Sequence, residues 1–315
     1  MIDVCICTHN PRRDVLALTI SALANQNAEP NVFRVVVVDN ASSPALSETI
    51  LEPLAHRGIS TLLIRESKPG LQHARIAATR HSSSDWVLWV DDDNEPSPDF
   101  IKNGMDFIKM HPEVGCFGGR LLLPNTAKHK KWFTPFLPFI GIRDPGNELM
   151  IEQVDRWTDA EPAGAGAWVH RKVMDEYIRR SEADESFFKL GRTGTNGLAS
   201  CDDSIMMRGA IRCGMSCAYV PSLELRHHID FARRSRFSYL IRLMYAYGIS
   251  HVILESMLNG SQDTPPCYAS KKHFLRLLLG VAKEGAQQSL AFGIGLVAYH
   301  LGVRSEYLRQ GTVKK

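Results

Sequence analysis

The sequence predicts an α/β protein whose mostly parallel sheet is covered by helices on both faces. Short apolar runs alternate with stretches of helical periodicity through the first third of the chain, and this order is typical of a strand–helix–strand fold. Apart from Asp3 and Arg34, these runs contain almost only apolar residues, as expected for strands that are buried on both faces. With 44% hydrophobic and 23% charged residues, the composition is that of a globular protein rather than a disordered one.

The elements follow in order along the first third. Four strands are predicted, at Ile2–Cys7, Phe33–Val38, Thr61–Ile64 and Trp86–Val90. The turn-prone Asn10-Pro11 ends the first strand. Apolar residues at helical spacing predict an amphipathic helix over Arg13–Asn27 and a second helix over Gly70–His81. These elements predict a sheet flanked by helices, similar to the Rossmann arrangement.

The middle of the chain is different, because Pro124–Gly146 contains four prolines and a group of aromatic residues. The aromatic residues are Trp132, Phe133, Phe136 and Phe139. We expect a long irregular segment whose aromatic side chains either cover an acceptor or anchor the segment to the core. Glycines in residues 191–197 predict a mobile loop. A helix is then predicted over Ser204–Gly214 and a buried strand over Cys217–Val220.

The last part is predicted to be a C-terminal helical extension. Arginines and apolar residues at helical spacing predict a basic amphipathic helix over residues 233–247. Its basic face is either solvated or lies on an anionic membrane surface. Two apolar helices are predicted over Phe274–Leu279 and Ala291–Tyr299, and mutual packing, dimerisation and lipid contact are all open for them.

Composition argues against several classes of protein. The formal net charge of +3 is too small to predict nucleic-acid binding. Seven scattered cysteines, an odd number, argue against a disulfide scaffold, and Cys213 with Cys217 lacks the second pair of a zinc site. We see no signal peptide, and no apolar run reaches the about 18 residues of a spanning helix, the nearest being Leu290–Val303. We therefore expect a soluble cytoplasmic protein.

Polar residues cluster where three of the predicted strands end. The clusters are Thr8-His9-Asn10, Asp39-Asn40-Ala41-Ser42-Ser43 and Asp91-Asp92-Asp93-Asn94. Because ligands of open α/β sheets bind outside the carboxyl ends of the strands, the clusters predict one crevice. Residues two apart on a strand face the same way, so Asp91 and Asp93 can converge while Asp92 points away. Such carboxylates suit Mg²⁺ or Mn²⁺, and a solvated acidic turn is the alternative.

Two further groups are candidates for chemistry, and each has a structural alternative. Asp202 and Asp203 open a predicted helix, where the helix dipole alone favours acidic residues. His227 and His228 follow the predicted strand at Cys217–Val220. One imidazole could bind a metal or a phosphate, and a purely structural histidine pair is the alternative.

Together these motifs resemble the family-2 glycosyltransferases of the GT-A fold, over about residues 1 to 250. They occur in the family's order: Thr8-His9-Asn10, Leu23-Ala24-Asn25-Gln26, Val38-Asp39-Asn40-Ala41-Ser42-Ser43, Gly70 to Arg75, Asp91-Asp92-Asp93, Gly118-Gly119-Arg120, Gly164-Ala165-Gly166, Asp202-Asp203, and Pro221 with His227. The chain departs from the family at Asp202, where glutamate after a glycine is usual. It departs again at Ile76 and Ala78, where asparagine and glycine are frequent.

The resemblance implies a nucleotide-sugar site. Its residues are Thr8, Asn10, Asp39, Arg75, Asp91 and Asp92. Asp39, with the loop at Thr8, would hydrogen-bond the nucleobase, and Arg75 would help to hold the nucleotide. Asp91 would contact the ribose or the metal shell.

The resemblance also implies a metal site and a base. Asp93 would coordinate Mg²⁺ or Mn²⁺ at the diphosphate, and His227 would complete the metal or diphosphate site. Asp203 would be the general base that takes the proton of the acceptor hydroxyl.

The implied reaction moves a sugar from a nucleotide-diphosphate sugar, usually linked to UDP, to the hydroxyl of a carbohydrate or lipid-linked acceptor. It would be metal-dependent and would invert the anomeric configuration in a single displacement. The implied GT-A domain spans residues 1–230, with a nucleotide-binding half at 1–120 and an acceptor half at 121–230. Residues 231–315 would form the C-terminal helical region. Polysaccharide biosynthesis is an expectation of the same kind. Peripheral contact with the inner face of a membrane and a homodimer are expected from the basic and apolar helices of the last part of the chain.

Three rival functions fit parts of the pattern. A metal-dependent nucleotidyl or phosphoryl transferase would share the acidic triplet, but a phosphatase with an aspartyl nucleophile places its aspartates after the first strand. A non-catalytic nucleotide-sugar-binding or scaffold relative is disfavoured because the triplet and Asp203 are both present. A dinucleotide-dependent oxidoreductase is disfavoured because no Gly-x-Gly-x-x-Gly follows the first strand.

Overall fold

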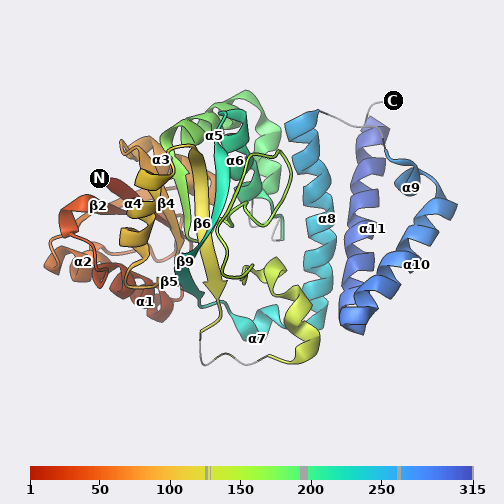
Figure 1. Cartoon of the computed structure of the whole chain (residues 1–315), viewed down its shortest axis with the longest axis horizontal. Helices are drawn as coiled ribbons and strands as arrows, with labels where there is room; N and C mark the ends of the chain where they lie inside the picture. Colours follow the sequence, from red (N-terminus) through yellow and green to blue (C-terminus); the bar gives the residue numbers. More distant parts are fainter. Residues whose placement is uncertain (125–126, 128, 192–197, 261–263, 314–315) are drawn as a thin grey trace. The chain divides into compact units, whose positions relative to one another are not determined.

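The computed structural model describes residues 1–124, 127, 129–191, 198–260 and 264–313 (Figure 1). The chain divides into two compact units. The sheet unit comprises Met1–Asn125, Gly141–Glu185 and Asp203–His228, and the helical unit comprises Thr126–Ile140, Ser186–Asp202 and Ile229–Lys315. The domain boundaries expected from the sequence stay a prediction.

The sheet unit is built on one sheet, which has nine strands among the described residues, in the order β3-β2-β1-β4-β8-β6-β9-β5, with β7 paired to β9. Their bounds are β1 Ile2–Thr8, β2 Phe33–Asn40, β3 Ser60–Glu66, β4 Trp86–Asp91, β5 Asn94–Pro96, β6 Val114–Leu122, β7 Met150–Glu152, β8 Ala167–His170 and β9 Ser216–His227. Strands β3, β2, β1 and β4 pair in parallel, whereas β8 is antiparallel to β4 and β6. The predicted α/β class is confirmed. The four strands predicted from the first third form the parallel half of the sheet, and the other half is mixed.

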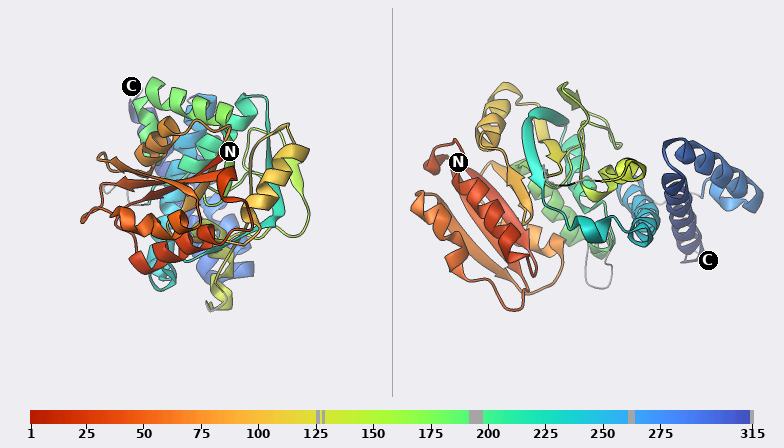
Figure 2. Two further views of the ribbon diagram at one scale, coloured as in Figure 1. Left: turned by 90° about the vertical axis from the view of Figure 1, so that its left-hand side faces the viewer. Right: turned by 90° about the horizontal axis from the view of Figure 1, so that it is seen from below.

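Helices cover both faces of the parallel half (Figure 2). The helices that lie wholly or mainly in this unit are α1 Arg13–Ala24, α2 Glu52–His56, α3 Leu71–His81, α4 Phe100–Met110, α5 Arg171–Ala183 and α6 Asp202–Arg212, with the short 3-10 helices η1 Pro30–Val32 and η2 Glu48–Leu51. Val4 of β1 shares an apolar core with Leu16 of α1 and Leu54 of α2. The next residue of the strand, Cys5, faces the opposite side, where α3 packs. Burial on both faces explains why β1, β2 and β4 are mostly apolar.

Strand β9 is longer than the sequence predicts. The sequence predicts that this strand ends before Pro221, but the strand continues to His227. The pairing of β6 with β9 shifts register beside Gly119, and such an irregularity accommodates a proline that cannot donate to the ladder. A Cβ at Gly119 would lie 1.9 Å from the carbonyl oxygen of Leu223, so only glycine allows this close approach. The continued strand reaches β5, where His227 pairs with Asn94.

The helical unit contains the predicted C-terminal helices. Its elements are η3 Lys131–Phe136, η4 Pro138–Ile140, α7 Phe231–Arg234, α8 Phe237–Asn259, α9 Pro266–Ala269, α10 Lys271–Gln288 and α11 Leu290–Val313, and η5 Glu185–Leu190 lies almost wholly within it. Helix α8 packs along α11, and α11 packs along α10 (Figure 1). A Cβ at Gly248 of α8 would lie 2.0 Å from the carbonyl oxygen of Tyr299, and one at Gly302 of α11 would lie 2.0 Å from that of Tyr245. The two backbones are therefore in direct contact.

The basic helix expected over residues 233–247 is divided. Helix α7 ends at Arg234 and α8 begins at Phe237. The side chain of Asp230 accepts a hydrogen bond of 3.1 Å from the amide of Arg233 and so caps α7. The extended backbone of Arg236 separates the two helices. Helical spacing of apolar residues alone cannot reveal such a local break.

The proline-rich segment is more regular than expected, because it forms η3 and η4. Phe133 and Phe136 are fully buried. The ring of Phe136 meets Phe292 of α11 edge-on, with centroids 5.2 Å apart, and Phe139 meets Tyr247 of α8 at 5.6 Å. These contacts favour the anchoring role over a lid. Of the glycine-rich loop expected at residues 191–197, only Gly191 lies within the described residues.

One helix among the described residues, α8, is long and apolar enough to cross a membrane when judged by length and composition alone. In its most apolar stretch 44% of the residues are buried inside the protein. The apolar run that the sequence marks as nearest to a spanning helix, Leu290–Val303, lies instead in α11.

A buried ion pair joins the first two strands and makes a prediction about stability. Arg34 donates two hydrogen bonds to the fully buried carboxylate of Asp3, from Nε at 2.9 Å and from Nη2 at 3.0 Å. Burial alone would raise the pKa of Asp3, but the hydrogen bonds from Arg34 and Ser82 outweigh it and the pKa is lowered. Asp3 therefore stabilises the fold above its unfolded-state pKa, and this contribution is lost as the pH falls through its lower folded-state pKa.

We expect Arg34→Ala to lower the free energy of unfolding by about 3–5 kcal/mol at pH 7, because a buried charge is left without its partner. The loss should shrink in acid, because the Asp3 carboxylate of the variant, buried without Arg34, then takes up a proton that the wild-type carboxylate does not. Urea unfolding at pH 7 and at pH 4 measures both effects. Arg80→Ala is the control: the Arg80–Glu182 pair has side chains 57% and 60% exposed, so its loss should cost under about 1 kcal/mol. An equal, small effect of both variants would contradict this account.

Candidate active site

The strand register brings the three polar clusters to one edge of the sheet, as predicted. Thr8 at the end of β1 pairs with Asp39 at the end of β2. On the other side of β1, Cys7 pairs with Asp91 at the end of β4. The carboxyl ends of three adjacent parallel strands thus present their polar residues at the same level.

The loops after β1 and β2 are joined by hydrogen bonds. Asn10 has a positive φ of 48°; its amide donates to Ser42 Oγ at 2.9 Å, and its side-chain oxygen accepts from the Ser43 amide at 2.8 Å. The carboxylate of Asp39 accepts from the amides of Ser42 at 3.2 Å and Leu46 at 2.9 Å. Although burial alone would raise the pKa of Asp39, these hydrogen bonds lower it, so Asp39 is ionised. These hydrogen bonds hold the two loops together at this edge of the sheet.

Asp92 is separated from its two neighbours, as the alternation along a strand predicts. Its carboxylate accepts a hydrogen bond from the hydroxyl of Thr8. Burial raises the pKa of Asp92 to about 6; the hydrogen bond from Thr8 opposes this shift, whereas the charges of Asp93 and Asp91 add to it. Asp92 thus ties β4 to β1 rather than joining the other two aspartates.

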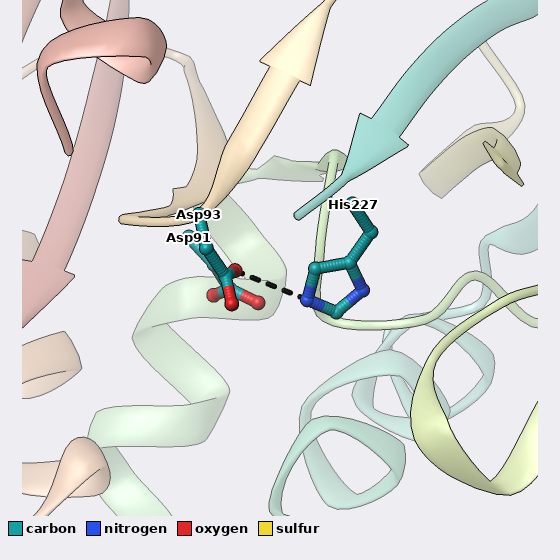
Figure 3. A group of neighbouring side chains, drawn as sticks. All are labelled: Asp91, Asp93 and His227. Atoms are coloured by element: carbon teal, nitrogen blue, oxygen red, sulfur yellow. Dashed lines mark ion pairs between the residues drawn. The ribbon is translucent and has the colours of Figure 1, made fainter. Parts of the chain in front are cut away.

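Asp91, Asp93 and His227 converge (Figure 3). Each offers one ligand atom, and the three atoms lie within 4.8 Å of one another. His227 Nε2 lies 3.0 Å from Asp93 Oδ1. Asn94, which is fully buried, accepts from the amide of Asp91 at 2.8 Å and so sets the turn between β4 and β5. The group comes from β4, the turn after it and the end of β9.

The tautomer of His227 follows from its second contact. Its Nδ1 lies 2.9 Å from the carbonyl oxygen of Gly141. Because a carbonyl only accepts, Nδ1 carries a proton. Nε2 donates to Asp93 when it is protonated as well, and in the neutral ring it offers a lone pair to a cation beside the two carboxylates. A ring nitrogen fixed by a carbonyl behind it is typical of a metal-binding histidine. Two carboxylates and one imidazole fit Mn²⁺, and the carboxylates also fit Mg²⁺.

A second group lies beside Trp89, two residues before Asp91 on the same side of β4. The guanidinium carbon of the buried Arg75 is 5.8 Å from the centroid of the Trp89 ring. The amide of Gly164 donates to Asp203 Oδ2 at 3.0 Å. A Cβ at Gly164 would lie 2.6 Å from Arg75 Nη2 and 3.1 Å from Asp203 Cβ. Arg75 and Asp203 therefore lie against the same glycine, which has no room for a side chain.

The carboxylate of Asp203 is held by donors from two segments. Its Oδ1 accepts from the amide of Ser204 at 2.9 Å, as an acid in the first turn of a helix does. Its Oδ2 is held by Gly164 from a different segment, which helix capping does not explain. Two residues earlier, Cys201 has a φ of 71°, a conformation that favours glycine. In the family that the sequence resembles, a glycine usually precedes the acid pair. Here Cys201 stands in its place and keeps the positive φ that favours glycine.

Sequence reasoning missed several buried polar residues of this edge. Asn40 donates to the carbonyl oxygens of Glu66 and Lys68 and accepts from the amide of Gly70. Glu161 and Arg208, each at most 4% exposed, form an ion pair near Asp203. Asn40 belongs to the polar cluster after the second predicted strand, although the sequence gives it no role of its own. Glu161 lies in a loop, where no periodicity marks a buried acid.

A comparison with known protein families decides which family this arrangement belongs to. The family described as "Glycosyl transferase family 2" matches residues 3–178, more than half of the chain. The chain belongs to glycosyl transferase family 2. Its family-2 region contains β1 to β4, the acidic triplet and the Gly164 loop, whereas Asp203 and His227 lie beyond the match.

Relatives with curated names match the family-2 part of the chain. An "Uncharacterized glycosyltransferase" of Haemophilus influenzae is 25% identical over 114 residues, which is 36% of this chain and 36% of that protein. An "N-acetylglucosaminyltransferase" of Rhizobium meliloti is 29% identical over 138 residues, 43% of this chain and 31% of that protein. The match therefore spans about a third of the length of these relatives.

Solved structures show the fold of this family-2 glycosyltransferase domain. The mannosyltransferase PcManGT from Pyrobaculum calidifontis, in complex with GDP-Man and Mn²⁺, matches 98% of this chain and 87% of its own, with a TM-score of 0.60 and 17% identity. S. aureus TarS 1-349, in complex with UDP-GlcNAc, matches 98% of this chain and 92% of its own, with a TM-score of 0.52 and 14% identity. The predicted GT-A fold is confirmed by these likenesses.

Proposed function

We propose that this protein transfers a sugar from a nucleotide-diphosphate sugar to an acceptor hydroxyl. The convergence of Asp91, Asp93 and His227 at the end of β4 is the observation that supports this proposal most strongly. In a family-2 chain, such a group at the carboxyl edge of the sheet fits a site for a diphosphate and its cation. A solvated acidic turn would not place a buried histidine, fixed through its other nitrogen, against the carboxylates.

The donor nucleotide would lie along the edge formed by the loops after β1 and β2. In this proposal Asp39 hydrogen-bonds the base, with Thr8 and Asn10 shaping its pocket. Arg75, buried beside Trp89, holds the phosphates or the nucleotide by charge. Asp92 supports the site through its hydrogen bond with Thr8.

A divalent cation, Mn²⁺ or Mg²⁺, would be held by Asp91, Asp93 and His227. When bound there it would stabilise the negative charge that develops on the departing diphosphate. The chain's own contribution is to hold the three ligand atoms together before the donor arrives, since β4, β9 and the buried Asn94 fix their backbones.

Asp203 would act as the general base. The acceptor oxygen forms a bond to the anomeric carbon while the bond from that carbon to the diphosphate oxygen breaks, and the hydroxyl proton passes to the Asp203 carboxylate. One base without a nucleophile on the opposite face implies a single displacement with inversion of configuration. The amides of Gly164 and Ser204 hold the carboxylate in a fixed orientation.

The finer assignments are proposals as well. A UDP-linked donor is proposed from the family resemblance; among the similar structures one contains UDP-GlcNAc and another GDP-Man. We propose that the acceptor is a carbohydrate or a lipid-linked molecule and that the reaction belongs to polysaccharide biosynthesis. We also propose that the protein is cytoplasmic and lies at the inner face of a membrane. The exposed Leu275 and Leu279 of α10, beside basic residues, would suit peripheral contact or a homodimer. Co-sedimentation with anionic vesicles tests the membrane contact, and light scattering tests the homodimer.

Calorimetric titration of UDP and of GDP into the purified protein tests the proposed donor site. We expect UDP to bind in the presence of Mn²⁺, and its affinity to fall at least about tenfold in EDTA, because the diphosphate loses its counter-charge. GDP should bind more weakly than UDP under both conditions. Failure of both nucleotides to bind with Mn²⁺ would contradict the proposal. Tight binding of GDP alone would contradict only the choice of UDP.

A further inference from the structure

A buried ion pair, Glu161 with Arg208, lies close to Asp203. Glu161 and Arg208 are 4% and 3% exposed, and Glu161 Oε2 lies 3.5 Å from Arg208 Nε. Glu161 belongs to the loop that precedes β8, whereas Arg208 belongs to α6, the helix that begins with Asp202 and Asp203. Burying two charges costs several kcal/mol of solvation, so such a pair is a poor source of stability and its position needs another explanation.

The pair is connected to both ends of the Asp203 carboxylate. Ser204 donates its amide proton to Asp203 Oδ1 and its hydroxyl proton to the Glu161 carboxylate. On the other side, Gly164, whose amide donates to Asp203 Oδ2, lies three residues after Glu161 in the same loop. Glu161 therefore fixes both donors that orient Asp203: one through the hydroxyl of Ser204, the other through the loop.

The loop is anchored behind Glu161 as well. The amide of Glu161 donates to the carbonyl oxygen of Thr158 at 3.1 Å, and its own carbonyl oxygen accepts from Arg143 Nη1. With its backbone held and its side chain paired to α6, Glu161 locks the loop to the first two turns of that helix. A carboxylate held by donors from two rigid elements keeps one orientation during a reaction.

We propose that Glu161 is a positioning residue that orients Asp203 through Ser204 and the Gly164 loop, a role that rests on the proposed function of Asp203 as the base. Glu161 does not touch the substrate in this scheme. Its ionised carboxylate pairs with Arg208 and accepts from Ser204, and the lock between loop and helix weakens when that charge is removed.

The surroundings of Glu161 give the lock a pH dependence. Burial raises the pKa of Glu161 to about 7; the hydrogen bond from Ser204 and the charge of Arg208 lower it, and the charge of Asp203 raises it. Among the described residues, Arg143, which holds its backbone carbonyl, and Cys116 of β6, which interacts with its charge, are further titratable groups close to it. Glu161 is therefore ionised and paired above about pH 7 and protonated below it.

The test compares Glu161→Gln with the wild-type enzyme, using the full chain. We expect Glu161→Gln to lower kcat about tenfold while the KM for the donor and the Kd for UDP change less than about twofold. The kcat of the wild type should rise as the pH passes about 7, and this rise should be absent in the variant. Arg212→Gln is the matched control, because Arg212 lies on the same helix as Arg208, is 29% exposed and pairs with Asp155 from another segment; the variant should leave kcat and its pH profile unchanged.

A second variant tests the same connection in case Glu161→Gln does not fold. Ser204→Ala removes only the bridging hydroxyl, and we expect it to lower kcat about three- to tenfold; the double variant should be no slower than Glu161→Gln alone, because both changes break one connection. Wild-type kcat and an unchanged pH profile in Glu161→Gln, or wild-type kcat in Ser204→Ala, would overturn the role of Glu161. A wild-type enzyme that binds UDP and transfers no sugar would instead contradict the proposed function itself.

Discussion

Replacing Asp203 with asparagine is expected to lower kcat about 10²- to 10⁴-fold, the range that a general base contributes. Asparagine keeps the shape of the side chain, but its single carbonyl oxygen can accept from only one of the two amides, Gly164 or Ser204, that hold the wild-type carboxylate. It cannot take a proton from the acceptor hydroxyl. The Kd for UDP with Mn²⁺ should stay within about twofold, because the donor site does not need this proton transfer. Initial rates and calorimetry on the same preparation measure both quantities.

The control for this prediction is Asp155→Asn. Asp155 Oδ2 lies 3.2 Å from Nη2 of Arg212, the last residue of α6. The variant therefore alters an acid that contacts the same helix as Asp203 does, but at the opposite end. It should leave kcat unchanged. If Asp203→Asn transferred sugar at the wild-type rate, the base would have to be another residue.

Asp93→Ala should reduce kcat/KM by about 10³-fold or more, since the loss of several kcal/mol of charge stabilisation at the diphosphate is expected. The variant removes one of three converging ligands and leaves His227 without its 3.0 Å partner. Its UDP affinity in Mn²⁺ should fall to the value that the wild type shows in EDTA. That equality separates loss of the cation from a general loss of the nucleotide site.

Glu95→Ala is the matched comparison, because Glu95 is the next acid along the chain and pairs with His228 at 2.7 Å instead of with His227. It should retain its response to Mn²⁺ and change kcat/KM less than about threefold. Full activity of Asp93→Ala in the presence of a chelator would contradict the assignment of Asp93 as a metal ligand.

The parallel half of the fold and its polar edge could be predicted because both depend on short-range pattern. Strands β1, β2 and β4 are buried on both faces, so their sequences are mostly apolar, and the parallel register then places Thr8, Asp39 and Asp91 at one level. The convergence of Asp91 and Asp93 follows from their spacing of two. These inferences need no knowledge of distant contacts.

The rest depends on tertiary contacts that a pattern does not carry. The passage of β9 beyond Pro221 requires the close approach of Gly119 to Leu223, and without it His227 would not reach Asp93. The mixed second half of the sheet arises because β8 runs antiparallel between β4 and β6. The burial of Glu161 beside Arg208 joins a loop to a helix far along the chain, and neither residue stands out in its own neighbourhood.

The glycines that bring α8 and α11 together limit how the helical unit can change shape. Gly248 faces a carbonyl oxygen of α11, and Gly302 faces one of α8, so no layer of side chains separates the two backbones. Side chains can exchange rotamers and let helices slide, but two backbones in contact cannot. We therefore expect α8 and α11 to move together as one unit in any rearrangement of the helical unit.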